Sequence, residues 1–241
     1  MSKLKIVAVI QARMSSQRLP QKVLMDIEGQ TMLERVVNRV KEAKTLDEVV
    51  IATTVSEGDN AIVKLCEGHN WLCFRGSEPD VLDRFYQVAC FFKADAVVRI
   101  TADCPLIDPR LIDMVVEKFL SLYPNIDYVS EGLTNRTFPR GLDTEVINIG
   151  ALRNEWRTST KWREHVTLNI RKNSSRYRMA DIRNGKDYSY MRWCVDTAED
   201  LEFVRKVYRH FNNRKFYWGD VVKLLENYPE WVIIDTQVDP K

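Results

Sequence analysis

The residues best suited to chemistry form one basic segment near the N-terminus. Segment 11–22 (QARMSSQRLPQK) contains three cations and two small hydroxyls: Arg13, Arg18, Lys22, Ser15 and Ser16. Arginine binds phosphate oxygens through its planar guanidinium, whereas lysine acts as a point charge. The segment lacks glycine and the G-x-x-x-x-G-K-[ST] spacing, so it is not a Walker P-loop. Its composition predicts a polyphosphate-binding loop, and a solvated basic loop is the alternative.

Two carboxylates stand at the ends of apolar stretches and are candidate metal ligands. Asp103 lies in RITADCPLID, directly after a predicted strand, and Asp196 ends a later apolar stretch. Mg²⁺ prefers oxygen ligands and takes one or two protein carboxylates together with substrate phosphates. Asp108, which precedes a proline, is instead expected to cap the next helix. Thr197 and Asp200 are expected to form a capping box, so most of the acidity around Asp196 is structural.

Two other groups of residues suggest metal or substrate binding less specifically. Cys66, His69 and Cys73 have spacings that resemble zinc ligands, but no fourth cysteine or histidine lies near in sequence. Packing at a helix end is therefore the favoured interpretation of these three residues. His165 follows Glu164 without the H-E-x-x-H pattern, so a protease-type zinc site is not supported. A substrate contact and a structural role both stay open for this histidine.

The fold must place these residues at the ends of strands. Strands are predicted at 4–10, 48–53, 71–74, 94–100, 127–129 and 190–195, and helices at 31–43, 59–68, 80–92, 109–122, 198–211 and 219–227. Strands that alternate with helices predict an α/β fold with a doubly wound, mostly parallel sheet. In such sheets the ligand site lies off the carboxyl ends of the strands. The loops after strands, at 11–22, 75–83 and 101–108, are therefore the expected site.

Composition excludes several classes of protein. The chain has 241 residues, of which 45% are hydrophobic and 29% charged, with 36 Lys and Arg against 34 Asp and Glu. These values exclude a disordered or collagen-like chain and give no general reason to expect a nucleic acid or a membrane as partner. The five cysteines and the absence of a signal-like N-terminus or a long apolar run predict a reduced, cytoplasmic protein.

The middle of the chain differs from this balance. Between residues 136 and 192 there are thirteen basic residues against six acidic ones, which indicates either an anion-binding face or a solvated one. No internal repeat or low-complexity linker interrupts the chain. We therefore expect a single domain over 1–241, with a small inserted lobe at about 131–190 that binds an acceptor or forms a dimer contact.

Several motifs together resemble a known family. Segment 9–24 (VIQARMSSQRLPQKVL) is similar to the N-terminal signature of the CMP-sugar synthetases, which has I-P-A-R, a serine and then R-L-P-x-K-x-L. Segments 74–86, 99–109, 163–167 and 192–201 look closer still to the spore coat polysaccharide biosynthesis protein SpsF group of that superfamily. This superfamily includes the CMP-Kdo and acylneuraminate cytidylyltransferases. The likeness covers nearly the whole chain in order.

The resemblance implies a Rossmann-like nucleotide-diphospho-sugar transferase fold and a cytidylyltransferase activity. CTP and a sugar acid, or a related acidic or hydroxylated acceptor, would give a CMP-conjugate and pyrophosphate by in-line attack on the α-phosphate. It also implies a Mg²⁺ cofactor, a homodimer and a role in polysaccharide or glycoconjugate synthesis. Two departures from the family pattern are Gln11 in place of proline, which is expected to alter contacts to the base, and Ala102 in place of glycine.

The resemblance also assigns expected roles to single residues. The catalytic residues would be Arg13, Lys22 and Asp103, and the Mg²⁺ ligands Asp103 and Asp196. The nucleotide-binding residues would be Ala12, Arg13, Ser15, Ser16, Arg18, Lys22, Arg75, Asp80, Thr101 and Asp103. For the acceptor, the basic excess of the middle segment, and not the resemblance, offers the candidates Arg140, Arg163, Glu164 and His165.

Two other functions are weighed against this one. A glycosyltransferase on the same fold would typically carry an Asp-x-Asp metal motif, and the sequence has none. A non-catalytic module that binds nucleotides is the other candidate, and the presence of both Asp103 and Asp196 argues against it. A module that binds nucleic acid through the basic stretch 136–192 stays open, and weak, salt-independent binding to RNA would exclude it.

Overall fold

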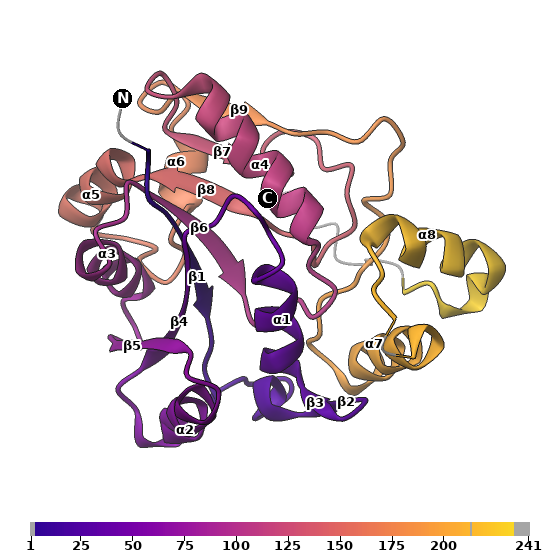
Figure 1. The fold of residues 1–241 in the computed structure, drawn as a ribbon. Coiled ribbons are helices and arrows are strands. Elements are labelled where there is room, and N and C mark those ends of the chain that lie inside the picture. The colour runs from indigo at the N-terminus through magenta and orange to yellow at the C-terminus, as the bar shows by residue number, and fades with distance from the viewer. Residues whose placement is uncertain (1–2, 213, 234–241) are drawn as a thin grey trace.

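The protein folds around one seven-stranded sheet. The structure, a computed structural model, describes residues 3–212 and 214–233. The strands of the sheet are β1 (Ile6–Gln11), β4 (Glu48–Thr54), β5 (Leu72–Gly76), β6 (Ala96–Thr101), β7 (Tyr128–Ser130), β8 (Glu145–Asn148) and β9 (Met179–Asp181). Their order is β5-β4-β1-β6-β8-β7-β9, and β8 alone among them runs antiparallel to both of its neighbours. The expected doubly wound, mostly parallel sheet is confirmed (Figure 1).

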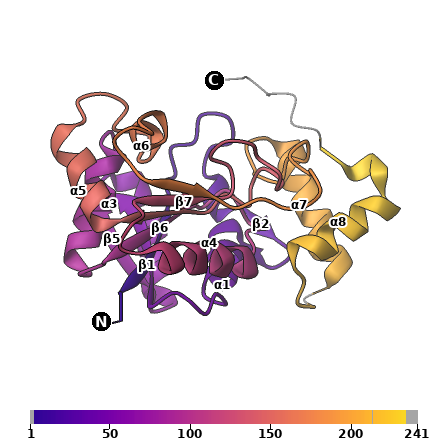
Figure 2. The ribbon, with the colours of Figure 1, turned by 90° about the horizontal axis from the view of Figure 1, so that it is seen from above.

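Helices cover both faces of the sheet. The helices are α1 (Met32–Val40), α2 (Asn60–Gly68), α3 (Val81–Phe91), α4 (Pro109–Leu122), α5 (Ile149–Thr158), α6 (Leu168–Lys172), α7 (Ala198–Phe211) and α8 (Trp218–Asn227). Figure 2 shows α1 and α4 on one side of the strands and α6 on the other, with α7 and α8 together at one end. None of the helices in the described part of the chain has the length and apolar character needed to cross a lipid bilayer.

The core has two layers because the buried strands are apolar on both faces. In β1, Ile6, Ala8 and Ile10 pack into a cluster with α1 and α4, whereas Val7 and Val9 pack into a second cluster with α3 and α5. Strands that alternate in this way between two apolar layers are typical of a parallel sheet covered on both sides. This arrangement fixes the carboxyl end of β1, where the basic segment begins.

Helix starts follow the local signals in the sequence. Thr31 and Glu34 form the expected capping box at α1, and Thr197 and Asp200 form the one expected at α7. Asp108 caps α4, where its carboxylate accepts hydrogen bonds from two backbone N–H groups. These caps determine where each helix begins relative to the preceding loop, and therefore where that loop crosses the edge of the sheet.

The second half of the chain departs from the expected pattern. A strand is predicted at 190–195, but in the described part of the chain this segment belongs to no named strand and makes isolated bridging contacts, such as the one between Arg192 and Arg140. Its alternating apolar residues, Met191, Trp193 and Val195, are buried in the main core cluster, yet among the described residues no neighbouring strand forms a full ladder with this segment. Residues 131–190, expected as a lobe, contribute β8 and β9 to the main sheet together with α5 and α6.

Two very short strands and three short 3-10 helices complete the described chain. They are β2 (Asp26–Ile27), β3 (Gln30–Thr31) and 3-10 helices at Lys22–Leu24, Glu57–Asp59 and Pro229–Trp231. The first of these 3-10 helices begins at Lys22, directly after Gln21, whose φ of 60° places it in the left-handed region. The basic segment therefore ends in a tight turn that sets the position of Lys22.

Candidate active site

A polar cleft lies where β1 and β6 end. It has a volume of about 370 Å³ and is lined by Gln11, Ala12, Arg13, Ser16, Gln17, Arg18, Lys22, Val23, Thr101, Ala102, Asp103 and Asp196. Its floor is built by the sheet, because Gln11 pairs with Thr101 and the N–H of Ala102 bonds to the carbonyl of Gln11. The cleft therefore unites the basic segment with both candidate metal ligands.

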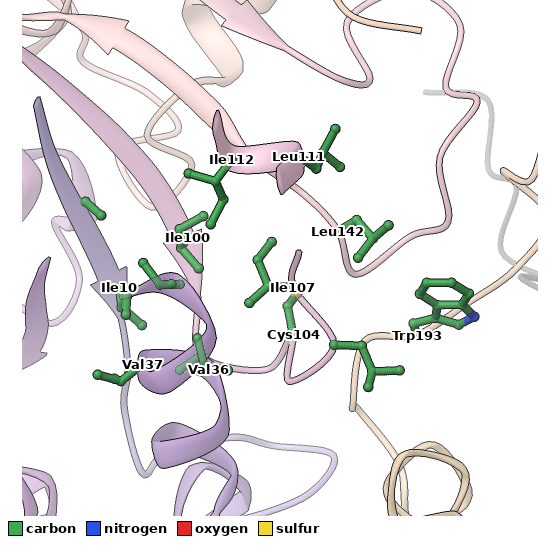
Figure 3. Close-up of a cluster of buried hydrophobic side chains, with 14 of the residues drawn as sticks. Ile10, Val36, Val37, Ile100, Cys104, Ile107, Leu111, Ile112, Leu142 and Trp193 are labelled. Carbon is green, nitrogen blue, oxygen red and sulfur yellow. The ribbon is translucent and has the colours of Figure 1, made fainter. Parts of the chain in front are cut away.

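Asp103 is placed by a turn that follows β6. The Cys104 N–H bonds to the carbonyl of Thr101, and Cys104 and Ile107 are buried beneath the turn. Figure 3 shows Cys104 and Ile107 in the apolar cluster that also contains Trp193 and residues of α1 and α4. Since its neighbours are anchored in the core, Asp103 stands at a defined point of the cleft.

Asp196 is brought to the same place by the segment before α7. The N–H of Val195 donates to the carbonyl of Asp103 at 2.8 Å, which ties the two segments together. The carboxylate of Asp200 accepts from the backbone N–H of Asp196 at 2.8 Å and thereby sets the backbone before the helix. Arg192 donates to the second oxygen of Asp196 at 2.6 Å.

Lys22 lies between the two carboxylates. Its Nζ donates to Oδ2 of Asp103 at 2.8 Å and to Oδ1 of Asp196 at 2.9 Å, and Arg18 contacts the same oxygen of Asp196 at 2.9 Å. Burial opposes the charge of Lys22, but the charges and hydrogen bonds of the two aspartates outweigh it, so its pKa is raised. Burial likewise opposes the charge of Asp196, but the cations around it lower its pKa. Lys22 and Asp196 are therefore both ionised at neutral pH.

The other residues of the basic segment surround the cleft mouth. Arg13 is exposed and lines the cleft, as does Ser16. Ser15 does not line it, because its hydroxyl donates to Glu78 at 2.8 Å. The backbone of this segment is held by buried Asp59, whose carboxylate accepts from the N–H of Met14 at 2.7 Å.

Three of the expected ligand-binding residues lie outside the cleft lining and are occupied by protein contacts. Arg75 donates to the carbonyls of Thr54 and Ser56 and so secures the loop after β4. Asp80 caps α3 and pairs with Arg163 at 2.7 Å. The guanidinium of Arg163 also donates to two backbone carbonyls at the end of α5.

The remaining expected acceptor residues lie on the middle segment. The backbone of Arg140 bonds to Met191 and Trp193, so this arginine stands beside the segment that leads to Asp196. Glu164 and His165 are exposed and stand 3.8 Å apart. None of these side chains lines the cleft itself.

The zinc-like spacing of Cys66, His69 and Cys73 has other contacts in the structure. His69 pairs with Glu34 at 2.9 Å and stacks on Trp71, and Cys66 is buried in the core. Within residues 3–212 and 214–233, no group of three or more His, Cys, Asp or Glu side chains is arranged to hold a metal ion. Asp103 and Asp196 stand as a pair of carboxylates on either side of Lys22.

Sequence reasoning gave no site role to three residues at or near the cleft. Arg192 lay in a predicted strand, and Asp59 was expected only to begin a helix, yet Arg192 contacts Asp196 and Asp59 holds the basic segment. Arg84 is 2% exposed, and burial together with the nearby charge of Arg13 lowers its pKa. For Gln11, which the sequence already singled out, the structure adds that its side-chain oxygen is buried without a hydrogen-bond partner among the described residues. Residues 192–196 lie before the helix, so the helical i, i+4 rule does not apply to Arg192 and Asp196, and no local pattern pointed to their contact.

Comparisons with known proteins agree with this arrangement. A family profile described as cytidylyltransferase matches residues 7–237. The spore coat polysaccharide biosynthesis protein SpsF of Bacillus subtilis is 32% identical over 235 residues, covering 93% of this chain and 95% of SpsF.

Solved structures show the same fold. A cytidylyltransferase from Leptospira borgpetersenii superposes with a TM-score of 0.91 at 29% identity, covering 95% of this chain and 97% of its own. A CMP-2-keto-3-deoxy-manno-octonic acid synthetase in complex with CTP superposes with a TM-score of 0.64 at 20% identity, covering 86% and 99%. With its profile match over nearly the whole chain, this protein belongs to the cytidylyltransferase family and is a nucleotidyl-transferring enzyme.

Proposed function

We propose that the enzyme transfers CMP from CTP to a sugar acid, or to a related acidic or hydroxylated acceptor, and releases pyrophosphate. The observation that supports this most directly is the cleft in which Arg13, Arg18 and Lys22 stand beside the converging carboxylates of Asp103 and Asp196. Such a cleft offers cations to a triphosphate and oxygen ligands to the metal that accompanies it. The product would serve polysaccharide or glycoconjugate synthesis, as the name of the Bacillus relative indicates for that protein.

The donor set fits Mg²⁺. Asp103 and Asp196 each direct one carboxylate oxygen at the same ammonium nitrogen, so the two oxygens already converge on a cation. Mg²⁺ takes one or two carboxylates and completes its shell with water and substrate phosphates. Bound there, it would neutralise charge on the phosphates and lower the pKa of an acceptor hydroxyl.

The protein's own side chains would position the substrates and neutralise the charge of the triphosphate. Arg13 and Arg18, exposed at the cleft mouth, would bind the triphosphate, and Lys22 would stabilise the charge that develops on the leaving pyrophosphate. Ala12, Ser16 and Thr101 would shape the floor. Because phosphoryl transfer needs little covalent work from the protein, holding the acceptor oxygen in line with the α-phosphorus is the main contribution.

Gln11 is our candidate for reading the base. It lines the cleft at the end of β1, and its side-chain oxygen is buried without a hydrogen-bond partner among the described residues. A buried acceptor left unpaired costs about 1–3 kcal/mol, so a ligand that donates to it gains affinity. Cytosine presents an amino donor where uracil presents a carbonyl, and this oxygen would favour cytosine.

The acceptor would be recognised from the middle segment by Arg140, Arg163, Glu164 and His165. We place residues 131–190 within a single domain over 1–241 and propose that they also supply the contact of a homodimer. Light scattering would detect such a dimer. Glu164 and His165 are exposed and free to meet an acidic ligand or a second copy. Arg75, Asp80 and Ser15 would act on the nucleotide by holding the loops that line the cleft.

The proposal is tested by measuring pyrophosphate release with each of the four NTPs and a panel of sugar acids and neutral sugars. We expect release with CTP, Mg²⁺ and a sugar acid, and its loss in Asp103→Asn. The exposed Asp187, away from the cleft lining, provides the matched control Asp187→Asn, which should keep full activity. Turnover that is insensitive to Asp103, or that prefers neutral sugars, would refute the scheme.

A further inference from the structure

Every donor of the Lys22 ammonium is used inside the protein. Nζ donates to Asp103 at 2.8 Å, to Asp196 at 2.9 Å and to the backbone carbonyl of Val195 at 2.7 Å. A lysine ammonium has three donors, so none is left for another ligand. Lys22 is also only 8% exposed. In this arrangement it cannot bind a triphosphate, although it lines the cleft that would hold one.

Similar contacts occupy both Asp196 oxygens that a metal ion would need. Oδ1 of Asp196 contacts both Lys22 and Arg18, and Oδ2 accepts from Arg192. The cluster as a whole joins three carboxylates to three cations: Asp103, Asp196, Asp200, Lys22, Arg18 and Arg192. Its formal charge is therefore zero, so it offers a divalent ion no net attraction, and Oδ1 of Asp103, which accepts from the Cys104 thiol at 3.6 Å, is the oxygen of the pair least engaged by a cation.

We propose that Lys22 is an exchangeable internal cation, which occupies the metal position between Asp103 and Asp196 until a nucleotide triphosphate draws it away. This inference rests on the proposed function. A triphosphate that enters with its metal brings new anionic partners for Lys22 and Arg18 and a cation for the carboxylates that they leave. Metal and nucleotide would therefore bind together, each raising the affinity of the other by the same factor.

The local structure permits this exchange without a change of fold. Lys22 carries its charge on a flexible four-carbon chain, so rotation of the side chain moves the ammonium while the backbone stays in place. The backbone is anchored on both sides, by Asp59 at Met14 and by the buried side chain of Val23. The Arg18 side chain is 58% exposed and is therefore free to turn.

The test is the affinity of the nucleotide-free protein for Mn²⁺, measured by electron paramagnetic resonance and calorimetry. Lys22→Met removes the internal cation and leaves two facing carboxylates. We expect this variant to bind Mn²⁺ without nucleotide at least about tenfold more tightly than the wild type, within the usual range of coupling between sites. Lys22→Gln gives a second variant if the first folds poorly, as judged by thermal melting.

The controls separate this effect from a general change of charge. Lys118 is an exposed lysine of α4 outside the cleft, and Lys118→Met should leave Mn²⁺ affinity unchanged. Lys22→Met combined with Asp196→Asn should lose the gain, because the ligand pair is broken. CTP should raise the Mn²⁺ affinity of the wild type more than that of Lys22→Met.

Equal Mn²⁺ affinity of the wild type and both Lys22 variants without nucleotide would overturn the proposal, as would an equal effect of CTP on them. This outcome is independent of the acceptor. If Lys22→Met gains affinity while no acceptor supports pyrophosphate release, the exchange stands and the proposed function fails. If metal-dependent CMP transfer is found but the gain is absent, the function stands and the exchange is wrong.

Discussion

Two ionic clusters in this protein contain similar residues, but one lines the candidate active site and the other stabilises the sheet. The cleft cluster consists of Lys22, Arg18, Arg192, Asp103, Asp196 and Asp200. The sheet network consists of two adjoining groups, one in which Glu145 binds Arg99, Tyr128 and Thr167, and one in which Arg136 pairs with Glu131 and Asp143 and also feels the charge of Glu145. The first opens on a cleft at the ends of β1 and β6, whereas the second lies between β6, β7 and β8.

The sheet network explains how a polar strand enters the core. Glu145 of β8 is 6% exposed and accepts from Arg99 of β6, from Tyr128 of β7 and from Thr167 at 2.8 Å. Burial opposes the charge of Glu145, but Arg99 and these hydrogen bonds lower its pKa. The network therefore connects the antiparallel strand to both of its neighbours.

The two clusters differ in whether a ligand can replace the partners of their charged side chains. In the cleft cluster Arg18 and Asp103 remain partly exposed, so a ligand can replace their partners. In the sheet network Glu131 and Glu145 are buried. Removal of one member would therefore leave its partners in the core without a compensating charge. Part of the basic excess between residues 136 and 192 therefore neutralises buried acids.

The largest expected effect is on activity in the cleft cluster. Asp103→Asn should lower kcat/KM for pyrophosphate release by about a thousandfold, since it removes a charge that the reaction requires. Its free energy of unfolding should change by less than about 1 kcal/mol, because the pair with Lys22 is partly exposed. A urea unfolding curve measured beside the kinetics checks both parts. Strong destabilisation would show that this cluster is structural as well.

The sheet network should show the reverse behaviour. Glu145→Ala leaves Arg99 without its partner and should lower the free energy of unfolding by about 3–5 kcal/mol. Urea unfolding measures the loss, with Glu117→Ala, an exposed site on α4, as the matched control. A loss no greater than that of the control would contradict the assignment of this network to stability.

Glu131 should make stability depend on pH. Burial and the charge of Asp143 raise its pKa to about 8, so the folded protein holds a proton that the unfolded chain releases above about pH 4.5. Stability should therefore fall as pH rises from about 5 to 8, with a slope of up to about 1.4 kcal/mol per unit. Glu131→Gln should flatten this dependence in thermal melts. An unchanged slope in the variant would exclude Glu131 as its source.

The proposed acceptor-binding residues Arg163 and His165 should differ in how much each contributes to stability and to acceptor binding. Arg163 makes three hydrogen bonds to the protein, so Arg163→Ala should lower the free energy of unfolding by about 1–3 kcal/mol. His165 is exposed, and His165→Ala should leave stability unchanged while raising the KM for the acceptor about tenfold. Kinetics with varied acceptor and urea unfolding together test this division. An unchanged acceptor KM in both variants would remove these residues from acceptor binding.

The smallest expected effect concerns the base. Gln11→Leu removes the buried oxygen and should reduce the preference for CTP over UTP by about tenfold, the value of one hydrogen bond. The ratio of kcat/KM for the two nucleotides measures it. A preserved ratio would show that other groups read the base.

The first half of the fold was predictable because its signals are local. Strands such as β1 are continuous apolar runs, and the caps at Thr31 and Asp108 mark the starts of their helices. β8 was missed because its residues EVIN begin with a glutamate, whose burial depends on Arg99 in a distant strand. The prediction of a strand at 190–195 was wrong because the local pattern suggested a strand that the tertiary structure does not form. Its pattern suits a strand, but the fold provides no ladder for it.

The sequence alone determined which residues could carry the chemistry: Lys22, Asp103 and Asp196 were each visible from residue type and from position after a strand. Only the tertiary structure decided that they contact one another. Lys22 is 81 residues from Asp103 and 174 from Asp196, and a pairing over such distances depends on sheet order and on the turns that close it. Residue type and local periodicity can be identified in the sequence itself. The partner of a charged side chain, in contrast, depends on which strand ends are neighbours in the folded sheet.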